Sequence, residues 1–524
     1  MKATPHCLFL FFFFFFLPIV CYYCEERIQS LTMQLFPQLI VIISILDHLS
    51  TSQASNTAIV GYDPDTNVAD RAKIDLDQKA IEEDLAIPDF SAAKSHYING
   101  GNSVKSDGSI RTIQDLSVNN CKILNRGLPQ FNIYNNYWRS KGLTNCQFGD
   151  DMVNAAFDAT ALASTGFTFA ASENPVTGSD DFRVQAIQKS TVYEIVMMYS
   201  MYEVQDAIVD CENSDFTNNT GSVKAIDEAV AFHVGSQEGQ VKGGIDGLMT
   251  TSGNVRYLMF ALAEKRCANF GTCTADAPDT NPTEGYSAVN GELMSLFTDL
   301  QSQFDLAAGL SHTPAGWSCS DAETIRDFIF SKLLVPLVQG VLRYLWKTDP
   351  AVGTATNKEL GELWAFATAI LPMVDSVDSE VASALYERAW NQDFNTNDFA
   401  SMKTMLESTY SGLGITCADV GQLCDNTNSG SDCVPYSEPY STATCVDAST
   451  SSSSASSAKD DSALIGGLSA MAVIIFVVSA VIIWHLYQKN KATHQRLLEF
   501  EGGASLGMHS HMEAYDSKTA VLGV

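Results

Sequence analysis

The sequence predicts a mainly α protein: an internally duplicated helical-bundle ectodomain followed by one C-terminal transmembrane helix. Apolar residues recur at helical spacing between residues 110 and 413, and runs that alternate at strand spacing are scarce there. One uncharged run of 22 residues near the carboxyl end has the length of a bilayer span. The chain has 524 residues, 46% of them hydrophobic, which suffices for a globular core and for several domains.

The composition is strongly acidic, and this disfavours one class of partner. Asp and Glu number 61 against 31 Lys and Arg, so the formal charge is -30. Nucleic acid needs a positive binding face, and such a face would lie in a negative surrounding field. We therefore expect no nucleic-acid partner, whereas cationic ligands fit the charge.

Residues 1–54 are expected to be a signal peptide region. They contain two apolar runs, residues 7–23 and 35–46, each closer in length to a signal-peptide core than to a membrane span. If translation begins at Met33, the second run is the apolar core of a signal peptide, and the small residues at 50–54 are its cleavage region. The alternative is an amino-terminal anchor helix. Both interpretations predict that the chain enters the secretory route.

Residues 55–109 form an N-terminal segment, and two helical repeats are predicted after it, 110–280 and 281–413. KAIDEAVAF at 224–232 and KELGELWAF at 358–366 share the pattern K-x3-E-x2-A-F. Two further matches occur in the same order, so we predict an internal duplication. The alternative is that helices rich in Ala, Glu and Lys resemble one another without common descent.

Ten of the 13 cysteines follow residue 54, and in a secretory protein this even number predicts disulfides. Four of the ten crowd into residues 414–448, a polar stretch that we interpret as a Cys-rich knob. Residues 449–462 read as a Ser-rich stalk. Asn218 begins one glycosylation sequon.

Residues 463–485 are the predicted transmembrane helix, and 486–524 the cytoplasmic tail. Basic residues follow the apolar run directly, while Lys459 and two acids precede it, so the positive-inside rule predicts type I topology. A buried core helix is the alternative. This places the ectodomain outside the cell, at the plasma membrane. The tail contains no strict endocytic sorting motif.

The motifs of common enzymes are missing from the sequence, which has no GxSxG elbow, no HExxH and no P-loop. We therefore expect a binding protein and not an enzyme. Only three histidines lie between residues 54 and 462, while carboxylates and tyrosines abound. Such oxygen donors suit hard cations, and phenolate in particular suits Fe(III).

Three clusters of ligand residues stand out. The first has i, i+3, i+4 and i+7 spacing, which predicts one helical stripe. Inward-facing carboxylates from several helices are one way to build a metal site in a bundle. For each cluster the alternative is a solvated face or an interhelical salt bridge. The clusters are Tyr199, Tyr202, Glu203 and Asp206; Asp227, Glu228 and His233; and Tyr257, Glu264 and Arg266.

Two stretches resemble the signature of the low-iron-inducible periplasmic proteins of algae, the phytotransferrin family. They are AVAFHVGSQEG at 229–239 and YLMFALAEKRCANFGTC at 257–273, and WAFATAILP at 364–372 is similar to that family's second-half motif. The resemblance implies iron acquisition at the cell surface. For membrane-anchored members it implies capture of ferric iron with carbonate, followed by internalisation.

The chemistry of the clusters suggests a set of iron ligands, which would release the metal on acidification. The alternative function is an adhesion or signalling ectodomain that binds a macromolecular partner without metal. Arg266 and the loop from Gly235 to Gly239 are expected to hold the carbonate, because arginine and converging amides commonly bind anions. The expected Fe(III) ligands are Tyr202, Glu228, His233 and Glu264, with Tyr257 as a substitute.

Overall fold

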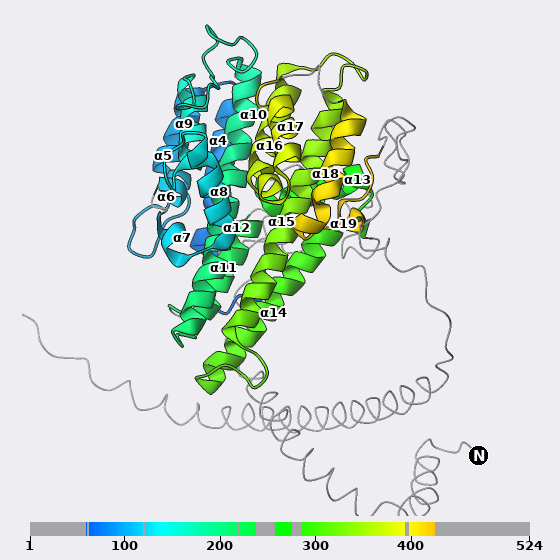
Figure 1. Ribbon diagram of the computed structural model, residues 1–524. Coiled ribbons are helices and arrows are strands. Elements are labelled where there is room, and N and C mark those ends of the chain that lie inside the picture. Colours follow the sequence, from blue (N-terminus) through cyan, green and yellow to red (C-terminus); the bar gives the residue numbers. More distant parts are fainter. Residues whose placement is uncertain are drawn as a thin grey trace, which may run out of the picture. The chain divides into compact units, whose positions relative to one another are not determined.

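A computed structural model describes residues 59, 62–118, 121–217, 220–236, 257–274, 286–392 and 398–424. These residues form a bundle of α-helices and one short antiparallel pair of strands, so the predicted mainly α class is confirmed (Figure 1). The signal region, the stalk, the transmembrane run, the tail and most of the knob lie outside the described residues, as do Asn218 and Gly239.

The elements of the first predicted repeat and of the segment before it are α3 (Ala69–Ala72), α4 (Ile74–Leu85), α5 (Phe90–Asn99), α6 (Ile113–Val118), α7 (Cys121–Arg126), α8 (Pro129–Ser140), α9 (Phe148–Asp158), α10 (Asp180–Ser190), the π-helix η2 (Thr191–Val196), α11 (Met197–Glu212), α12 (Ser222–Val234), α13 (Met259–Phe270) and β1 (Cys273–Thr274). The elements after them are β2 (Tyr286–Ser287), α14 (Ala288–Leu310), α15 (Cys319–Lys347), α16 (Asn357–Val377), α17 (Ser379–Ala389), α18 (Phe399–Leu413) and α19 (Cys417–Val420).

Two long helical stretches organise the bundle. One is the continuous run α10–η2–α11, which begins where the Ser179 hydroxyl accepts a hydrogen bond from the Phe182 amide. The other is α15, which begins at a capping box formed by Ser318 and Asp321. These caps satisfy amides that a helix start leaves free. The two stretches pack on each other through α11 and α15, side by side in Figure 1.

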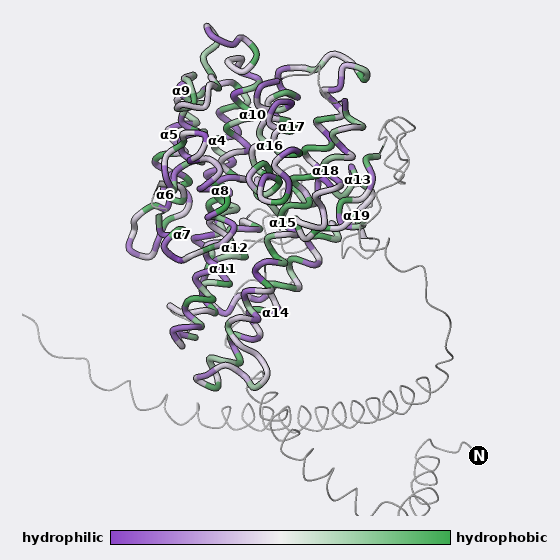
Figure 2. The backbone as a smooth tube through the Cα atoms, viewed as in Figure 1, coloured by the Kyte–Doolittle hydropathy of each residue, from purple (hydrophilic) through white to green (hydrophobic). Residues whose placement is uncertain are grey.

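Close packing between helices depends on a glycine at one crossing. Gly361 of α16 lies against the backbone of Phe182 in α10, where an added Cβ would come within 2.8 Å of the Phe182 carbonyl oxygen. A larger residue would therefore force α10 and α16 apart. In Figure 2 hydrophobic and hydrophilic stretches alternate along the helices, as expected when one face of each helix is buried.

A similar run of three helical elements occurs in each of the two predicted repeats, although the helices around it differ. A long stretch comes first, α10–η2–α11 or α15, then a second helix, α12 or α16, and then a short one, α13 or α17. Glu228 and Glu362 each lie on the second helix. This order is what a duplication predicts, and superposition of the two halves is the test that the repeat still requires.

Disulfides are present, as the cysteine count predicts. Cys211 at the end of α11 joins Cys319 at the start of α15, and Cys267 joins Cys273 beyond α13. The first bond closes a loop of 108 residues, which by loop-closure entropy stabilises the fold by about 4–5 kcal/mol. Cys417 and Cys424 are also disulfide-bonded.

Two described helices are long and apolar enough to cross a membrane by length and composition alone, α15 and α16. In each, 78% of the most apolar window is buried inside the protein. Core helices of folded proteins pass the same test, and this burial is typical of them. The predicted span at 463–485 lies outside the described residues.

Candidate metal centre

The first ligand stripe lies on α11, where it faces α12 and the short helices before α8. The rings of Tyr199 and Tyr202 stand 5.2 Å apart, and Tyr199 also packs edge-on against Phe232 of α12 at 5.1 Å. Glu203 is only 5% exposed. We call Tyr199, Tyr202, Glu203, Asp206 and Glu228 the acid cluster.

Glu228 joins this cluster from α12, and a basic residue from the N-terminal segment holds it. Arg71 of α3 places Nη2 2.7 Å from the Glu228 Oε1 atom, and its Nη1 donates to Asp70 at 2.7 Å. Lys224, one turn before Glu228, stands 3.5 Å from the same oxygen. The Glu228 carboxylate is therefore compensated by two cations.

Within the described part of the chain, no cation forms an ion pair with Glu203. Burial raises its pKa well above the ordinary range, and the neighbouring carboxylates of Glu228 and Asp206 raise it further. Arg71 and Arg111 oppose this shift without cancelling it. The side chain therefore holds a proton more tightly than an exposed glutamate does.

Arg126 of α7 closes the other end of the cluster. Its Nε lies 2.5 Å from the Asp206 Oδ1 atom, and its guanidinium also donates to the phenol oxygen of Tyr202. Burial, then Asp206 and Glu203, raises the pKa of Tyr202 to about 12, although Arg126 lowers it. Asp210, one turn further on, has its pKa raised to about 6, mainly by burial.

The cluster offers phenol and carboxylate oxygens, but its carboxylates do not converge on one point. Within the described ranges, no three His, Cys, Asp or Glu side chains are placed to hold a single ion. A metal ion could bind here only with a tyrosine among its ligands, or after Glu228 separates from Arg71 or Asp206 separates from Arg126. The structure brings Tyr202 and Glu228 into this one cluster, as the ligand prediction requires.

His233 lies elsewhere, although it follows Glu228 on α12. It is 1% exposed and packs against the rings of Phe260 and Phe297, at 6.1 Å and 5.8 Å. Burial lowers its pKa to about 3, so the imidazole is neutral. Its Nε2 atom finds no hydrogen-bond partner in the described part of the chain.

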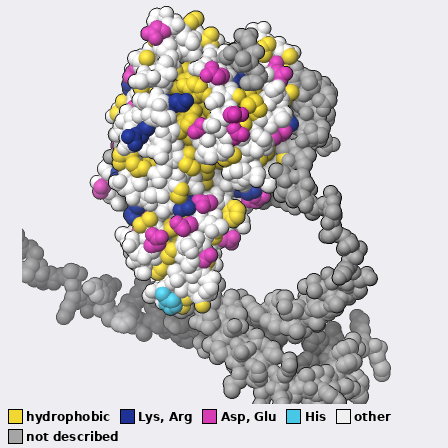
Figure 3. Space-filling model, in the orientation of Figure 1, with side chains coloured by type: hydrophobic (Ala, Val, Ile, Leu, Met, Phe, Trp, Pro, Cys, Tyr) yellow, Lys and Arg dark blue, Asp and Glu magenta, His cyan; other side chains and the backbone are white. Residues whose placement is uncertain are grey.

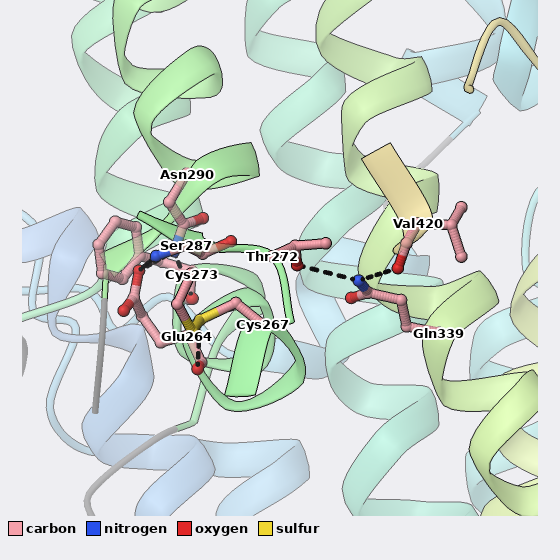
Figure 4. Close-up of a disulfide and its surroundings, with 9 residues drawn as sticks. Glu264, Cys267, Thr272, Cys273, Ser287, Asn290, Gln339 and Val420 are labelled. Atoms are coloured by element: carbon pink, nitrogen blue, oxygen red, sulfur yellow. Dashed lines mark hydrogen bonds between the residues drawn. A yellow bond between two sulfur atoms is a disulfide. The ribbon is translucent and has the colours of Figure 1, made fainter. Parts of the chain in front are cut away.

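Glu264 lies at the junction of α13, β2 and α14 (Figure 4). Its Oε1 atom accepts hydrogen bonds from the Ser287 amide at 2.9 Å and from the Asn290 side chain at 2.8 Å. The Cys267–Cys273 disulfide lies beside it. These contacts give Glu264 a structural role that ties α13 to the start of α14.

Tyr257 and Arg266 line a separate cavity, together with side chains of α10 and α16. Gly235 ends α12 with φ of +83°, and the next residue already binds a carboxylate of the chain itself. The Ser236 amide and hydroxyl both donate to Asp75 at 2.7 Å. The beginning of the predicted anion loop therefore engages Asp75.

One known protein family matches the part of the chain that contains the acid cluster. Residues 40–277 match the family described as low iron-inducible periplasmic protein (Fea1). The family resemblance is confirmed over these residues. The match to the low-iron-inducible family includes α3 to α13, and hence Arg71, Tyr202 and Glu228. No curated protein and no solved structure matched the chain.

Sequence reasoning missed the arginines around the acid cluster. No role was assigned to Arg71 or Arg111 themselves, and they reach the cluster only through the tertiary fold. One signal was present in the sequence: basic residues are scarce, at 31 of 524, so each of them was a candidate partner for a buried carboxylate.

Proposed function

We propose that this protein binds ferric iron at the cell surface and serves its uptake, with carbonate as a second ligand of the metal. The observation that carries the proposal is the acid cluster, where Tyr202, Glu203 and Glu228 supply buried oxygen donors inside the family-matched region. Fe(III) is a hard cation that prefers such donors. The protein acts as a binding protein and not as an enzyme, anchored with type I topology by residues 463–485.

Arg71 is the best placed holder of the carbonate. It bonds Glu228 through Nη2, while its Nε atom lacks a hydrogen-bond partner among the described residues. When Glu228 turns from Arg71 to the metal, the guanidinium becomes available to a planar dianion, which it can bind through two parallel hydrogen bonds. This assignment replaces Arg266, whose cavity is lined by other residues.

Acidification releases the ion in this proposal. Fe(III) can bind Tyr202 and Glu203 only in their deprotonated forms, and both groups have raised pKa values, that of Tyr202 being about 12. Protons therefore compete strongly with the metal, and affinity falls as pH falls. Protonation of the carbonate acts in the same direction, so an acidic compartment suffices for release.

The test is a titration of the full-length protein in detergent with Fe(III), with and without bicarbonate, followed by visible absorption. We expect a phenolate-to-iron charge-transfer band that requires bicarbonate, fades on acidification and disappears in Tyr202→Phe. The matched control is Tyr410→Phe on α18, a buried tyrosine whose hydroxyl lacks a described hydrogen-bond partner. Wild-type affinity in Tyr202→Phe would remove Tyr202 from the site. Failure of the folded wild type to bind Fe(III) with bicarbonate would favour the adhesion or signalling function.

A further inference from the structure

A second charged site lies apart from the acid cluster, in a cavity of about 550 Å³ between α4, α10–η2, α13 and α16. Its wall carries four cationic side chains, Lys189, Lys265, Arg266 and Lys358, and two carboxylates, Glu82 and Glu362. We call it the cationic cavity. An excess of positive charge in one cavity is unexpected in a chain with a formal charge of -30.

The surface does not present basic residues in this way on the face that Figure 3 draws. There, dark-blue Lys and Arg side chains are scattered among magenta acidic ones. The cavity instead gathers cations from three helices that are far apart in sequence: α10, α13 and α16. Such convergence focuses a positive potential inside a concave site.

The cations are only partly compensated by the cavity's own groups. Lys189 donates to the Gln185 side chain at 2.6 Å and stands 3.7 Å from Glu362. Burial raises the pKa of Glu82, although Lys189 and Lys265 oppose this shift. Desolvation, Arg266 and Lys189 lower the pKa of Lys265 to about 8. The lowered pKa of Lys265 is the direction that neighbouring positive charge produces.

Arg266 supplies the most specific observation. It is 2% exposed, its Nη1 donates to Asn269 at 2.8 Å, and its guanidinium stands 5.3 Å from the ring of Phe366. Its Nε–H has no hydrogen-bond partner among the described residues. A buried donor on a charged group is costly to leave unpaired, so a bound acceptor is the expected complement.

We propose that the cationic cavity binds a small organic or inorganic anion that carries at least two negative charges on carboxylate or phosphate oxygens. The volume lies in the range of small-molecule sites and exceeds what a single chloride or carbonate would fill. The side-chain amides of Gln185 and Gln188 and the phenols of Tyr193 and Tyr257 offer further hydrogen bonds.

This site does not depend on the proposed iron site. Tyr193 of the cavity and Glu203 of the acid cluster are ten residues apart on one continuous helix, which corresponds to about 15 Å. Binding of the anion can therefore be measured on iron-free protein. Its failure would leave the iron proposal untouched, and failure of iron binding would leave this one untouched.

The experiment is isothermal titration of the iron-free, full-length protein with citrate and, in a separate arm, with pyrophosphate, at matched ionic strength. Acetate is the monovalent probe. We expect citrate or pyrophosphate to bind at least tenfold more tightly than acetate, and the stronger of the two identifies carboxylate or phosphate as the natural oxygen.

The variants are chosen on exposed positions so that folding is preserved. Lys265→Gln combined with Lys358→Gln should weaken binding by at least tenfold, because both side chains line the cavity and both are exposed. Lys105→Gln, a lysine outside the cavity wall, should leave affinity unchanged. Wild-type affinity in the folded double variant, or equal binding of acetate and the multivalent anions, would overturn the proposal. Failure of wild-type protein to bind either multivalent anion at millimolar concentration would overturn it as well.

Discussion

Two charged regions lie along the same long helix, and they differ in how their charges are compensated. In the acid cluster, Glu228 and Asp206 are held by Arg71 and Arg126 at 2.7 Å and 2.5 Å. In the cationic cavity, Arg266 retains an unpaired donor and Lys265 is crowded by other cations. A cation must therefore displace existing partners in the first region, whereas an anion can add partners in the second.

The difference teaches that net charge does not describe a local site. A formal charge of -30 favours cationic ligands on average, yet the wall of the cationic cavity carries four cations and only two carboxylates. A charge paired with an opposite charge of the protein keeps its favourable contact in the ligand-free fold. A charge without such a partner gains one only when a ligand binds, so ligand binding stabilises the fold. Removing a charge that has a close partner should therefore lower stability, and removing a charge that has none should raise it.

The largest effect is expected for Arg71→Gln. Removing one partner of a buried ion pair costs about 3–5 kcal/mol when the other charge is left uncompensated, and Glu228 would retain only the more distant Lys224. Arg71 and Glu228 are 19% and 11% exposed, so we expect a loss of about 3 kcal/mol in denaturant unfolding. Lys224→Gln is the control, since Lys224 stands 3.5 Å from the same oxygen and is 33% exposed, and should cost less than about 1 kcal/mol. Equal losses in the two variants would contradict the compensated character of the cluster.

The next effect concerns the pH dependence of stability in the iron-free protein. Burial and neighbouring carboxylates raise the folded-state pKa of Glu203 above its unfolded value of about 4.3. Between these values the folded state binds more protons than the unfolded state, so stability falls as pH rises through this window. Glu203→Gln removes the ionisation, and should gain about 1–2 kcal/mol at pH 8 and almost nothing at pH 4.

The measurement is the free energy of unfolding at pH 4, 6 and 8 for wild type and Glu203→Gln. Glu387→Gln on the exposed side of α17 is the matched control and should show no pH-dependent gain. A parallel shift of the Glu203→Gln curve at all three pH values would mean that the carboxyl is not titrating in that range.

A smaller effect, opposite in sign to that of Arg71→Gln, is expected in the cationic cavity. Lys265→Met relieves repulsion from Arg266 and Lys189, and the side chain is exposed, so stability without ligand should change by less than about 1 kcal/mol, toward stabilisation. Added citrate should raise the melting temperature of wild type more than that of the variant. A large destabilisation by Lys265→Met would show that this cation is compensated after all.

Cysteine chemistry gives a further small effect. Cys121 and Cys146 are free thiols that contact each other, and burial with the Cys121 contact raises the pKa of Cys146 to about 12. Oxidation by a dithiol–disulfide exchange enzyme of the secretory route would join them, as the count of ten ectodomain cysteines predicts. Peptide mapping of protein from the secretory route should recover the linked pair, and alkylation of both residues in the native protein would contradict this.

Much of the fold could be predicted because helical periodicity is local. The apolar spacing around Val192 and Phe330 correctly indicated helices, and both lie in the long stretches that organise the bundle. The π-helix η2 could not be predicted in this way, because a wider turn leaves the apolar pattern of Thr191–Val196 almost unchanged.

The candidate site was only partly predictable, since its members come together through tertiary packing. Residue spacing alone predicted that Tyr202 and Glu203 lie on one helical stripe, and the structure adds Glu228 from the adjacent helix. Spacing could not separate His233 from Glu228, which share α12 but have different neighbours. Anion binding by Arg266 stays a prediction, and the structure places this residue in a cavity whose other cations come from α10, α13 and α16.

The smallest effect is expected for His233→Phe, and it decides between the predicted ligand set and the acid cluster. The imidazole packs between Phe260 and Phe297, and its pKa of about 3 keeps it neutral, so a phenyl ring replaces it with little electrostatic change. We expect stability within about 1.5 kcal/mol of wild type, as for other volume-conserving core substitutions, and an unchanged Fe(III) charge-transfer band. The band should be recorded in bicarbonate beside Tyr202→Phe, with folding of both variants checked by circular dichroism. Loss of the band in folded His233→Phe, with the band retained in Tyr202→Phe, would move the iron site from the α11 stripe to the carboxyl end of α12.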